Sequence, residues 1–391
     1  DTDGQINVII VEKRKNFESR GSTFGLAHSG QIALQEIAPT VLRELRSVGI
    51  FIPETGGYML PWWKVRDALL DEARSMPDRI TIHLGVSIDK LEVTEGKDAP
   101  LMATFQESDL NIEADVVIGA DGVHSYVRQH ILRLPPARPT NTYVWRGSVD
   151  TNAVEDLKYL QAIEVFKTVT FGEIIMLIYF NFHPSVEGKV AWTFSCSPND
   201  SSIGIEAGTT PLDLIKAYVD TFENPGEELQ ADYHEAKLVF ENTNHPSDLT
   251  WGTEMVVVDL THEAGWGGKG RITLVGDAAH SLRPVSGLGG SLAFEDAALL
   301  SRAITGDNSY GTIERRLRDF EAKRLPRCKS LSNDQTLRAV LAYKHGIGTV
   351  PQWDPKYKAW VFEGPDASPE PPVDEEDVLR DLLTVWSRNA Q

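Results

Sequence analysis

An aspartate and a group of glycines lie where a strand gives way to a helix, an arrangement that can hold a ligand. The apolar run 272–275 predicts a buried strand, and it ends in Gly276-Asp277. The run Gly287-Leu-Gly-Gly290 then opens a long amphipathic helix. Backbone N–H groups at such a helix start can bind an anionic or electron-rich ligand, and the Asp277 carboxylate can accept hydrogen bonds from a sugar hydroxyl.

Two other acidic residues follow predicted strands in the same way. The run 115–122 predicts a buried strand that ends in a tight Asp121-Gly122 turn, and Ser125 can cap the helix after it. Near the start, the β-branched run 7–11 is followed by Glu12. Rossmann-type folds hold ribose hydroxyls with an acid at the end of a buried strand, although many exposed strands also end in Glu.

The elements that must position these residues alternate between strands and helices on both sides of a β-rich stretch. Strands are predicted at 7–11, 80–84, 88–93, 115–120, 255–260 and 272–275, and helices at 38–48, 65–75, 211–224, 290–304, 310–342 and 375–387. Between 142 and 193 polar and apolar residues alternate, which indicates an antiparallel sheet. The predicted class is α/β, with a β-rich insert in a first domain to which the chain returns.

These runs together resemble the FAD signatures of the group A flavin monooxygenases, the para-hydroxybenzoate and salicylate hydroxylase family, in its fungal secondary-metabolism form. Residues 276–298 match the family pattern without a gap, and 115–128 resembles its Asp-Gly motif. Ser281 and Leu288 depart from the pattern, because the family usually has Pro and often has Gln there. The resemblance implies a Rossmann-like FAD-binding domain with an inserted antiparallel-sheet substrate domain.

The resemblance also assigns cofactor-binding residues. It implies that FAD is held by Glu12, Gly25, Asp121, Asp277, Pro284, Gly289 and Gly290. Asp277 would bind ribityl or ribose hydroxyls, and Pro284 would line the pocket beside the reactive ring. The N–H groups of Gly289 and Gly290 would lie near the flavin pyrimidine. Glu12 would bind the adenosine ribose, and Gly25 would lie in a segment next to the isoalloxazine edge.

Two residues of the β-rich stretch are candidates for catalysis. The run Tyr143-Val-Trp-Arg146-Gly147 resembles a strand that many fungal members carry. Arg146 would orient the substrate or act as a cation or acid near the flavin; a salt-bridged surface arginine is the alternative. Tyr179 is the second candidate, because a buried tyrosine needs a hydrogen-bond partner that a substrate could supply. No histidine–carboxylate cluster has metal-binding spacing.

The implied activity is hydroxylation or epoxidation of an aromatic or polycyclic small molecule. NAD(P)H would reduce FAD, and O2 would form a flavin C4a-hydroperoxide that delivers one oxygen atom. The implied division is 1–140 and 256–345 for the FAD-binding domain, 141–255 for the substrate sheet and 346–391 for a tail with a helix. A flavin-independent cyclase or isomerase and an inactive fragment remain alternatives.

The start of the sequence departs from the family. Members begin with a strand, a Gly-x-Gly-x-x-Gly turn and a helix, and none of these precedes Glu12. That strand would lie in the centre of the sheet, so its apolar neighbours should be exposed. Trp62 stands where members have an Arg, with Arg66 one turn later. The sequence is therefore a fragment, an incomplete gene model or a flavin-independent derivative; Glu12, Asp121 and Asp277 favour the first two.

The composition is that of an acidic globular protein. The 391 residues carry a net charge of −19, which disfavours binding to nucleic acid and to anionic membranes. Cys196 and Cys328 are far apart and predict two reduced thiols, as in a cytoplasmic protein. The longest apolar stretch, 174–182, is too short to span a bilayer.

Overall fold

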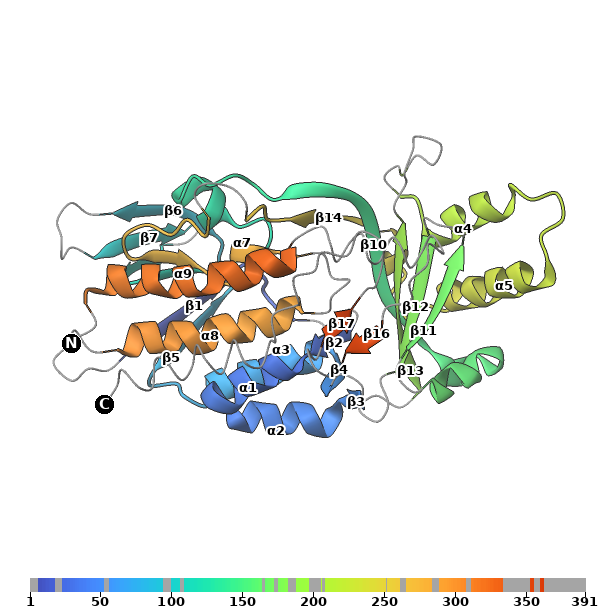
Figure 1. The fold of residues 1–391 in the computed structure, drawn as a ribbon, viewed down its shortest axis with the longest axis horizontal. Helices are drawn as coiled ribbons and strands as arrows, with labels where there is room; N and C mark the ends of the chain where they lie inside the picture. The colour runs from blue at the N-terminus through green and yellow to red at the C-terminus, as the bar shows by residue number, and fades with distance from the viewer. Residues whose placement is uncertain are drawn as a thin grey trace.

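The structure, a computed structural model, describes most of the chain up to residue 332 and two short segments beyond it. The described residues are 6–17, 23–52, 56–93, 100–105, 109–163, 166–171, 175–181, 188–196, 205, 208–250, 252–260, 265–282, 288–306, 311–332, 352–354 and 359–361. Figure 1 shows an elongated arrangement, with parallel strands and long helices at one end and a large antiparallel sheet at the other.

Two pairs of parallel strands form the centre of the first part. β1 (Val8–Glu12) pairs with β5 (Ile80–Leu84), and β9 (Val117–Gly119) pairs with β15 (Ile272–Leu274). β5 spans its predicted run, β1 is shifted by one residue, and β15 and β9 are one and three residues shorter than predicted. Their parallel pairing agrees with β-branched sequences that lack a polar face.

Apolar side chains are exposed along these strands. Val8, Ile9 and Ile10 are 42%, 45% and 38% exposed, and Ile118 is 40% exposed. Among the described residues β1 pairs only with β5, so its other edge has no strand partner. The predicted exposure of apolar residues on these strands is therefore observed.

Small antiparallel sheets and three helices complete this part of the molecule. They are β2 (Thr23–Leu26), β3 (Ile50–Ile52), β4 (Gly57–Pro61), β6 (Ile88–Val93), β7 (Leu101–Phe105), β8 (Asn111–Ala114), α1 (His28–Ile37), α2 (Pro39–Val48) and α3 (Trp62–Arg74). The sequence did not predict α1, which begins with Ser29-Gly30 inside its first turn. A Cβ on Gly30 would lie 2.8 Å from Cβ of Ser291, so glycine is needed where α1 crosses the neighbouring helix.

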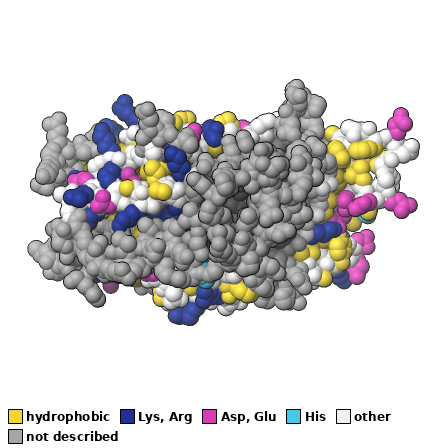
Figure 2. Space-filling model, in the orientation of Figure 1, with side chains coloured by type: hydrophobic (Ala, Val, Ile, Leu, Met, Phe, Trp, Pro, Cys, Tyr) yellow, Lys and Arg dark blue, Asp and Glu magenta, His cyan; other side chains and the backbone are white. Residues whose placement is uncertain are grey.

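The large sheet confirms the antiparallel prediction. Its five strands run in the order β11 (Phe166–Phe171), β12 (Ile175–Asn181), β13 (Lys189–Cys196), β10 (Arg138–Asp150) and β14 (Thr253–Val257). One face packs against α4 (Pro211–Val219) and α5 (Glu227–Glu241) in an aromatic core. The short helices are η1 (Val127–Ile131), η2 (Thr151–Ala153), η3 (Glu155–Ala162) and α6 (Ser247–Thr250). Figure 2 shows acidic side chains at the end that carries α4 and α5, in line with the net charge.

After the large sheet the chain returns to the parallel strands and forms the helices that cover them. A four-residue helix, α7 (Asp277–His280), follows β15, and the long helices α8 (Gly289–Thr305) and α9 (Ile313–Ser332) come next. α8 packs between α1 and α9. β16 (Gln352–Asp354) and β17 (Ala359–Val361) form a hairpin pair. The helix predicted over 375–387 lies outside the described residues.

The composition predicted reduced cysteines and no membrane-spanning segment. Cys196 and Cys328 are buried free thiols, as expected. None of the described helices is both long enough and apolar enough to cross a membrane.

Candidate functional site

The predicted ligand-binding aspartate lies on a turn that only glycine can begin. Gly276 follows β15 with φ 58° and ψ −142°, a conformation that a residue with a Cβ rarely adopts. α7 starts directly after it, and the side chain of Asp277 is exposed. Desolvation by its surroundings nevertheless raises the pKa of Asp277, with a partly offsetting effect of His280. Asp277 therefore combines an exposed side chain with a pKa that its surroundings raise.

The first turn of α8 lies beside Asp277. A Cβ placed on Gly289 would lie 4.0 Å from Oδ1 of Asp277, and one on Gly290 would lie 2.0 Å from Cε2 of Phe24. The contact at Gly289 is an ordinary van der Waals distance, whereas the close approach of Gly290 to Phe24 requires glycine; the start of α8 therefore lies beside Asp277 and against β2. The first N–H groups of a helix have no partner within it and carry partial positive charge. These N–H groups and the nearby carboxylate fit the phosphate, sugar and ring edges of a dinucleotide cofactor.

The segment around Gly25 adjoins the start of α8, as the resemblance requires. Oγ of Ser291 accepts a hydrogen bond from the N–H of Ala27 at 2.9 Å and donates to the carbonyl of Gly25 at 3.4 Å. The ring of Phe24 stacks on Trp62 with centroids 5.8 Å apart. Trp62 is 44% exposed, so its aromatic face is accessible at the position where the resemblance predicts an arginine.

The Asp121 motif is also brought to the α7 turn. Gly122 has φ 81°, and a Cβ placed on it would meet nothing within 4 Å, so space is open beside the turn. The carboxylate of Asp121 accepts hydrogen bonds from Ser125 Oγ at 2.5 Å and from the N–H of Val127 at 3.1 Å. Ser125 in turn accepts from the N–H of Arg128 at 2.9 Å, which confirms its predicted capping role.

Arg128 connects this motif to α7. Its side chain is 2% exposed, and burial lowers its pKa. Nη1 donates to the carbonyl of Ala278 at 3.5 Å and Nε to that of Pro135 at 2.9 Å. The segments of Asp121 and Asp277, which are far apart in the sequence, are therefore neighbours.

The remaining predicted cofactor residues are Glu12 and Pro284. Glu12 ends β1, and its Oε1 accepts a hydrogen bond from the N–H of Arg14 at 2.8 Å. Among the described residues no hydrogen bond joins Glu12 to Asp121 or Asp277. Pro284 lies outside the described residues.

Arg146 lies on the face of the large sheet that turns toward α3. The register aligns Arg146 with Thr193 of β13 and Thr193 with Ile178 of β12, so the three share a face. On that face Phe180 packs against Trp63 of α3. Arg146 keeps exposed surface while desolvation lowers its pKa, and it forms no ion pair with a described residue. Among the described residues Arg146 is therefore not part of a surface salt bridge, the alternative that the sequence left open.

Tyr179 lies on the opposite face of the same sheet. It aligns with Trp192, and both are fully buried in the core against α5. Its hydroxyl finds no hydrogen-bond partner among the described residues, and burial raises its pKa. The structure therefore does not bring Tyr179 together with Arg146.

A partly buried ion pair lies beside Tyr179. Nζ of Lys167 is 2.6 Å from Oε2 of Glu235 and 5.7 Å from the centre of the Tyr179 ring. Burial raises the pKa of Glu235 to about 7, and burial also lowers the pKa of Lys167, which the charge of Asp232 partly offsets. Both shifts favour the uncharged forms, because desolvation outweighs the attraction of the pair.

The Glu235 shift predicts a stability that falls as the pH rises through neutrality. Protonated Glu235 is favoured by the folded state, so its contribution is present below the unfolded pKa of 4.5 and is lost through about 7. Between pH 5 and pH 8 we expect the unfolding free energy to drop by roughly 1–2 kcal/mol more in the unmodified chain than in Glu235→Gln. Urea unfolding of both proteins at the two pH values measures this; parallel pH profiles would contradict it.

A fully buried charge network lies behind the α7 turn, and the sequence did not predict it. Arg324 of α9 donates from Nε to Asp296 Oδ1 at 2.7 Å and from Nη1 to Glu295 Oε2 at 2.6 Å. Arg327 donates to both oxygens of Glu295, at 2.7 and 2.8 Å. An acidic pair inside an apolar helix, with arginines three residues apart in the next helix, was the available signal.

One corner of the network has metal-ligand residue types. One ligand atom from each of His280, Asp296 and Cys328 lies within 4.8 Å of the others. However, the Arg324 guanidinium is bonded to Asp296 and lies 3.7 Å from Sγ of Cys328. Burial raises the pKa of that thiol to about 12. A bound arginine cation and a protonated thiol both oppose metal binding.

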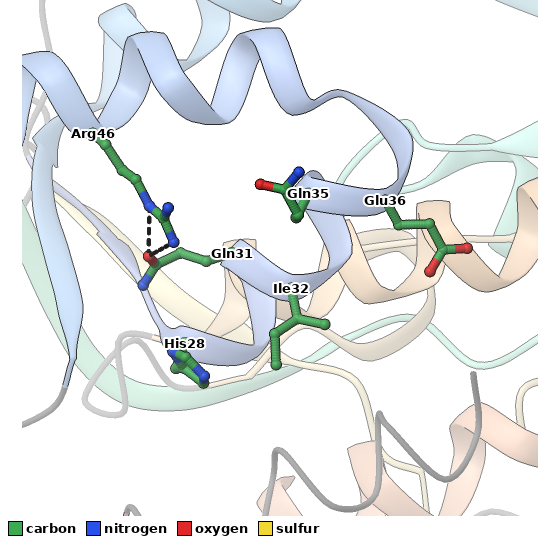
Figure 3. A pocket seen from close by; sticks show the side chains of 6 residues that line it. All are labelled: His28, Gln31, Ile32, Gln35, Glu36 and Arg46. Carbon is green, nitrogen blue, oxygen red and sulfur yellow. Dashed lines mark hydrogen bonds between the residues drawn. The ribbon is translucent and has the colours of Figure 1, made fainter. Parts of the chain in front are cut away.

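A shallow hollow of about 310 Å³ lies between α1 and α2 (Figure 3). It is lined by His28, Gln31, Ile32, Gln35, Glu36 and Arg46. Arg46 donates from Nε and Nη2 to the Gln31 carbonyl oxygen at 3.1 and 2.9 Å, and Glu36 pairs with Arg302 at 2.6 Å. None of the predicted site residues lines this hollow, and the polar groups of Gln31, Glu36 and Arg46 are engaged by the protein itself.

Comparison with known proteins also indicates FAD as the cofactor. A sequence model of the FAD binding domain matches residues 261–334, which include α7, α8 and α9. The aurachin C monooxygenase/isomerase of Stigmatella aurantiaca is 26% identical over 299 residues, 73% of this chain and 67% of that protein. The 6-methylsalicylate 1-monooxygenase of Aspergillus terreus is 26% identical over 276 residues, 68% of this chain and 56% of that protein.

The solved structures match over the whole fold. The crystal structure of CtdE in complex with FAD superposes with a TM-score of 0.69 at 17% identity, covering 98% of this chain and 100% of that chain. The fold is therefore the predicted α/β arrangement, a Rossmann-like FAD-binding part with an antiparallel sheet. The matched FAD binding domain and the monooxygenase relatives make the chain similar to the FAD-dependent group A flavin monooxygenases and support the predicted resemblance.

Proposed function

We propose that this protein uses FAD, NAD(P)H and O2 to hydroxylate or epoxidise an aromatic or polycyclic small molecule. The observation that carries the proposal is the Asp277 carboxylate beside the first turn of α8, within the stretch that matches the FAD binding domain. Bound FAD would supply the redox chemistry, taking a hydride from NAD(P)H and activating O2.

The residues of the chain would bind the cofactor and shape its surroundings. Asp277 would accept hydrogen bonds from the ribityl or ribose hydroxyls of FAD, and the N–H groups of Gly289 and Gly290 would stabilise negative charge on the ring. Asp121 and Glu12 would serve the pyrophosphate side and the adenosine ribose. We assign 1–140 and 256–345 to the FAD-binding domain, 141–255 to the substrate domain and 346–391 to the tail.

The substrate would lie between the FAD-binding part and the large sheet. Arg146, Thr193 and Ile178 share the sheet face on which Phe180 contacts Trp63 of α3. A partly desolvated cation beside apolar and hydroxyl side chains suits a planar molecule with an electron-rich or anionic group. The name of the Aspergillus terreus relative, a methylsalicylate monooxygenase, supports an aromatic substrate. Arg146 is therefore our catalytic candidate. Tyr179 is not, because its side chain faces the core.

Replacing Arg146 tests the substrate assignment. We expect Arg146→Gln to keep FAD but to lose product formation by roughly 10–100-fold, because a charged hydrogen bond contributes about 1.5–3 kcal/mol. Product is measured by mass spectrometry after incubation with NADPH, labelled O2 and a panel of aromatic acids. Arg138→Gln, at an exposed position of the same strand, is the matched control.

Three outcomes would change the assignment. Full turnover in Arg146→Gln would return Arg146 to a structural role. Loss of FAD in that variant would move Arg146 from substrate binding to cofactor binding. Product without NADPH and without labelled oxygen would indicate an isomerase or cyclase instead of a monooxygenase.

A further inference from the structure

One buried carboxylate holds both ends of the turn that presents Asp277. Oδ2 of Asp296 accepts a hydrogen bond from the N–H of Gly276 at 2.8 Å, before the turn. The same oxygen lies 2.6 Å from Nε2 of His280, at the end of the turn. An ionised carboxylate can only accept, so Nε2 of His280 carries the proton. The α7 turn is thereby fastened to α8 at two points.

These two bonds set the position of Asp277 relative to the start of α8. Asp296 lies two turns along the helix that begins with Gly289, and the side chains of Asp296 and His280 are fully buried. The Gly276 conformation costs free energy that the surroundings must supply. Among the described residues, the other hydrogen bonds that hold the turn are those of its own backbone, the bond from Arg128 to Ala278, and the bonds of the flanking residues Val275 and Ser281 to neighbouring strands and segments.

The charge of Asp296 is maintained from α9. Burial alone would raise the pKa of Asp296, but His280, Arg324 and the Gly276 N–H together lower it below its usual range. Arg324 supplies the counter-charge at 2.7 Å. Asp296 is therefore ionised across the neutral range and keeps its acceptor role.

We propose that Asp296 and His280 are positioning residues for the cofactor: they fix the Asp277 turn against the start of α8. Neither residue needs to touch FAD. The inference rests on the proposed function for its ligand, but the state of the turn itself can be measured without FAD. A purely structural role for the two residues is the alternative.

The experiment compares variants of matched chemistry. Asp296→Asn keeps the shape and removes the charge, and His280→Leu removes one bond while leaving the ion pairs in place. Glu321→Gln is the control, because Glu321 is a buried carboxylate of α9 that accepts from Thr273 of β15 and from Arg318, not from the turn. Amide hydrogen exchange over 272–282 is measured without FAD, and the FAD dissociation constant and the melting temperature are measured for each protein.

We expect amide exchange over 276–280 to speed up at least about 10-fold in Asp296→Asn and His280→Leu, and FAD to bind about 10-fold more weakly. Glu321→Gln should lower the melting temperature with FAD affinity changed less than about 2-fold. If Glu321→Gln weakens FAD as much as the other two at equal loss of stability, the positioning role is wrong.

The positioning role can still be tested if a variant does not fold or if the unmodified chain binds no FAD. If Asp296→Asn does not fold, His280→Leu alone tests the proposal, because its exchange must rise and its affinity must fall. If the unmodified chain binds no FAD, the proposed function fails, and exchange of the turn alone decides the positioning role. Unchanged exchange in His280→Leu would overturn it.

Discussion

Replacing Arg324 with methionine should lower the free energy of unfolding by about 3–5 kcal/mol, among the largest effects of any single substitution in this chain. The guanidinium is fully buried and bonds Asp296, Glu295 and the carbonyl of Leu292. Methionine has a similar length, but it leaves the Glu295 and Asp296 carboxylates in the interior. Arg327 is then the one remaining arginine of the network, and it bonds Glu295. Removing one partner of a buried pair costs more than the pair itself contributes, because a charge is left unpaired.

Urea unfolding of Arg324→Met and of Arg315→Met measures this effect. Arg315 lies on the same helix with its side chain 75% exposed, so its replacement should change stability by less than about 0.5 kcal/mol. Equal effects in the two variants would show that the buried network does not stabilise the fold.

Replacing Asp277 with alanine should weaken FAD binding by about 100-fold or more while leaving the fold intact. Two charge-assisted hydrogen bonds to sugar hydroxyls contribute about 3 kcal/mol or more in total. The side chain is exposed and its carboxylate is desolvated, which raises its pKa, so its loss removes no core contact. The stability of the ligand-free protein should be unchanged or slightly higher.

Flavin content after purification and the FAD dissociation constant from fluorescence quenching test this expectation. Asp277→Asn is the companion variant, because the amide keeps an acceptor oxygen and should lose less affinity than alanine. Unchanged flavin content in Asp277→Ala would contradict the assignment of this turn to the cofactor.

The parts of the site that the sequence predicted are those encoded locally. A buried strand, Gly276-Asp277 and a glycine-rich helix start follow one another within about twenty residues, so their local geometry is nearly determined by backbone rules. The antiparallel sheet was predicted from alternation in the same way. Packing among distant segments, such as Arg128 against Ala278, is not encoded locally.

The parts that were missed depend on which way a side chain points and on what it meets. β12 reads Ile-Met-Leu-Ile-Tyr-Phe-Asn, with apolar residues on both faces, so its sequence does not say which face Tyr179 takes. Only the register, with Tyr179 aligned to Trp192, places it in the core. Likewise α9 reads as a basic surface helix, and Arg324 is buried only because Glu295 and Asp296 meet it from α8.

In our proposal the Asp277 turn and the start of α8 hold FAD. An absorbance titration tests this assignment most directly. The purified chain is scanned across the oxidised-flavin bands, alone and with added FAD, and the bound flavin is counted per chain. We expect the bands to co-purify, or to shift on addition and saturate at one FAD per chain. A colourless protein that leaves the spectrum of added FAD unchanged would contradict the claim.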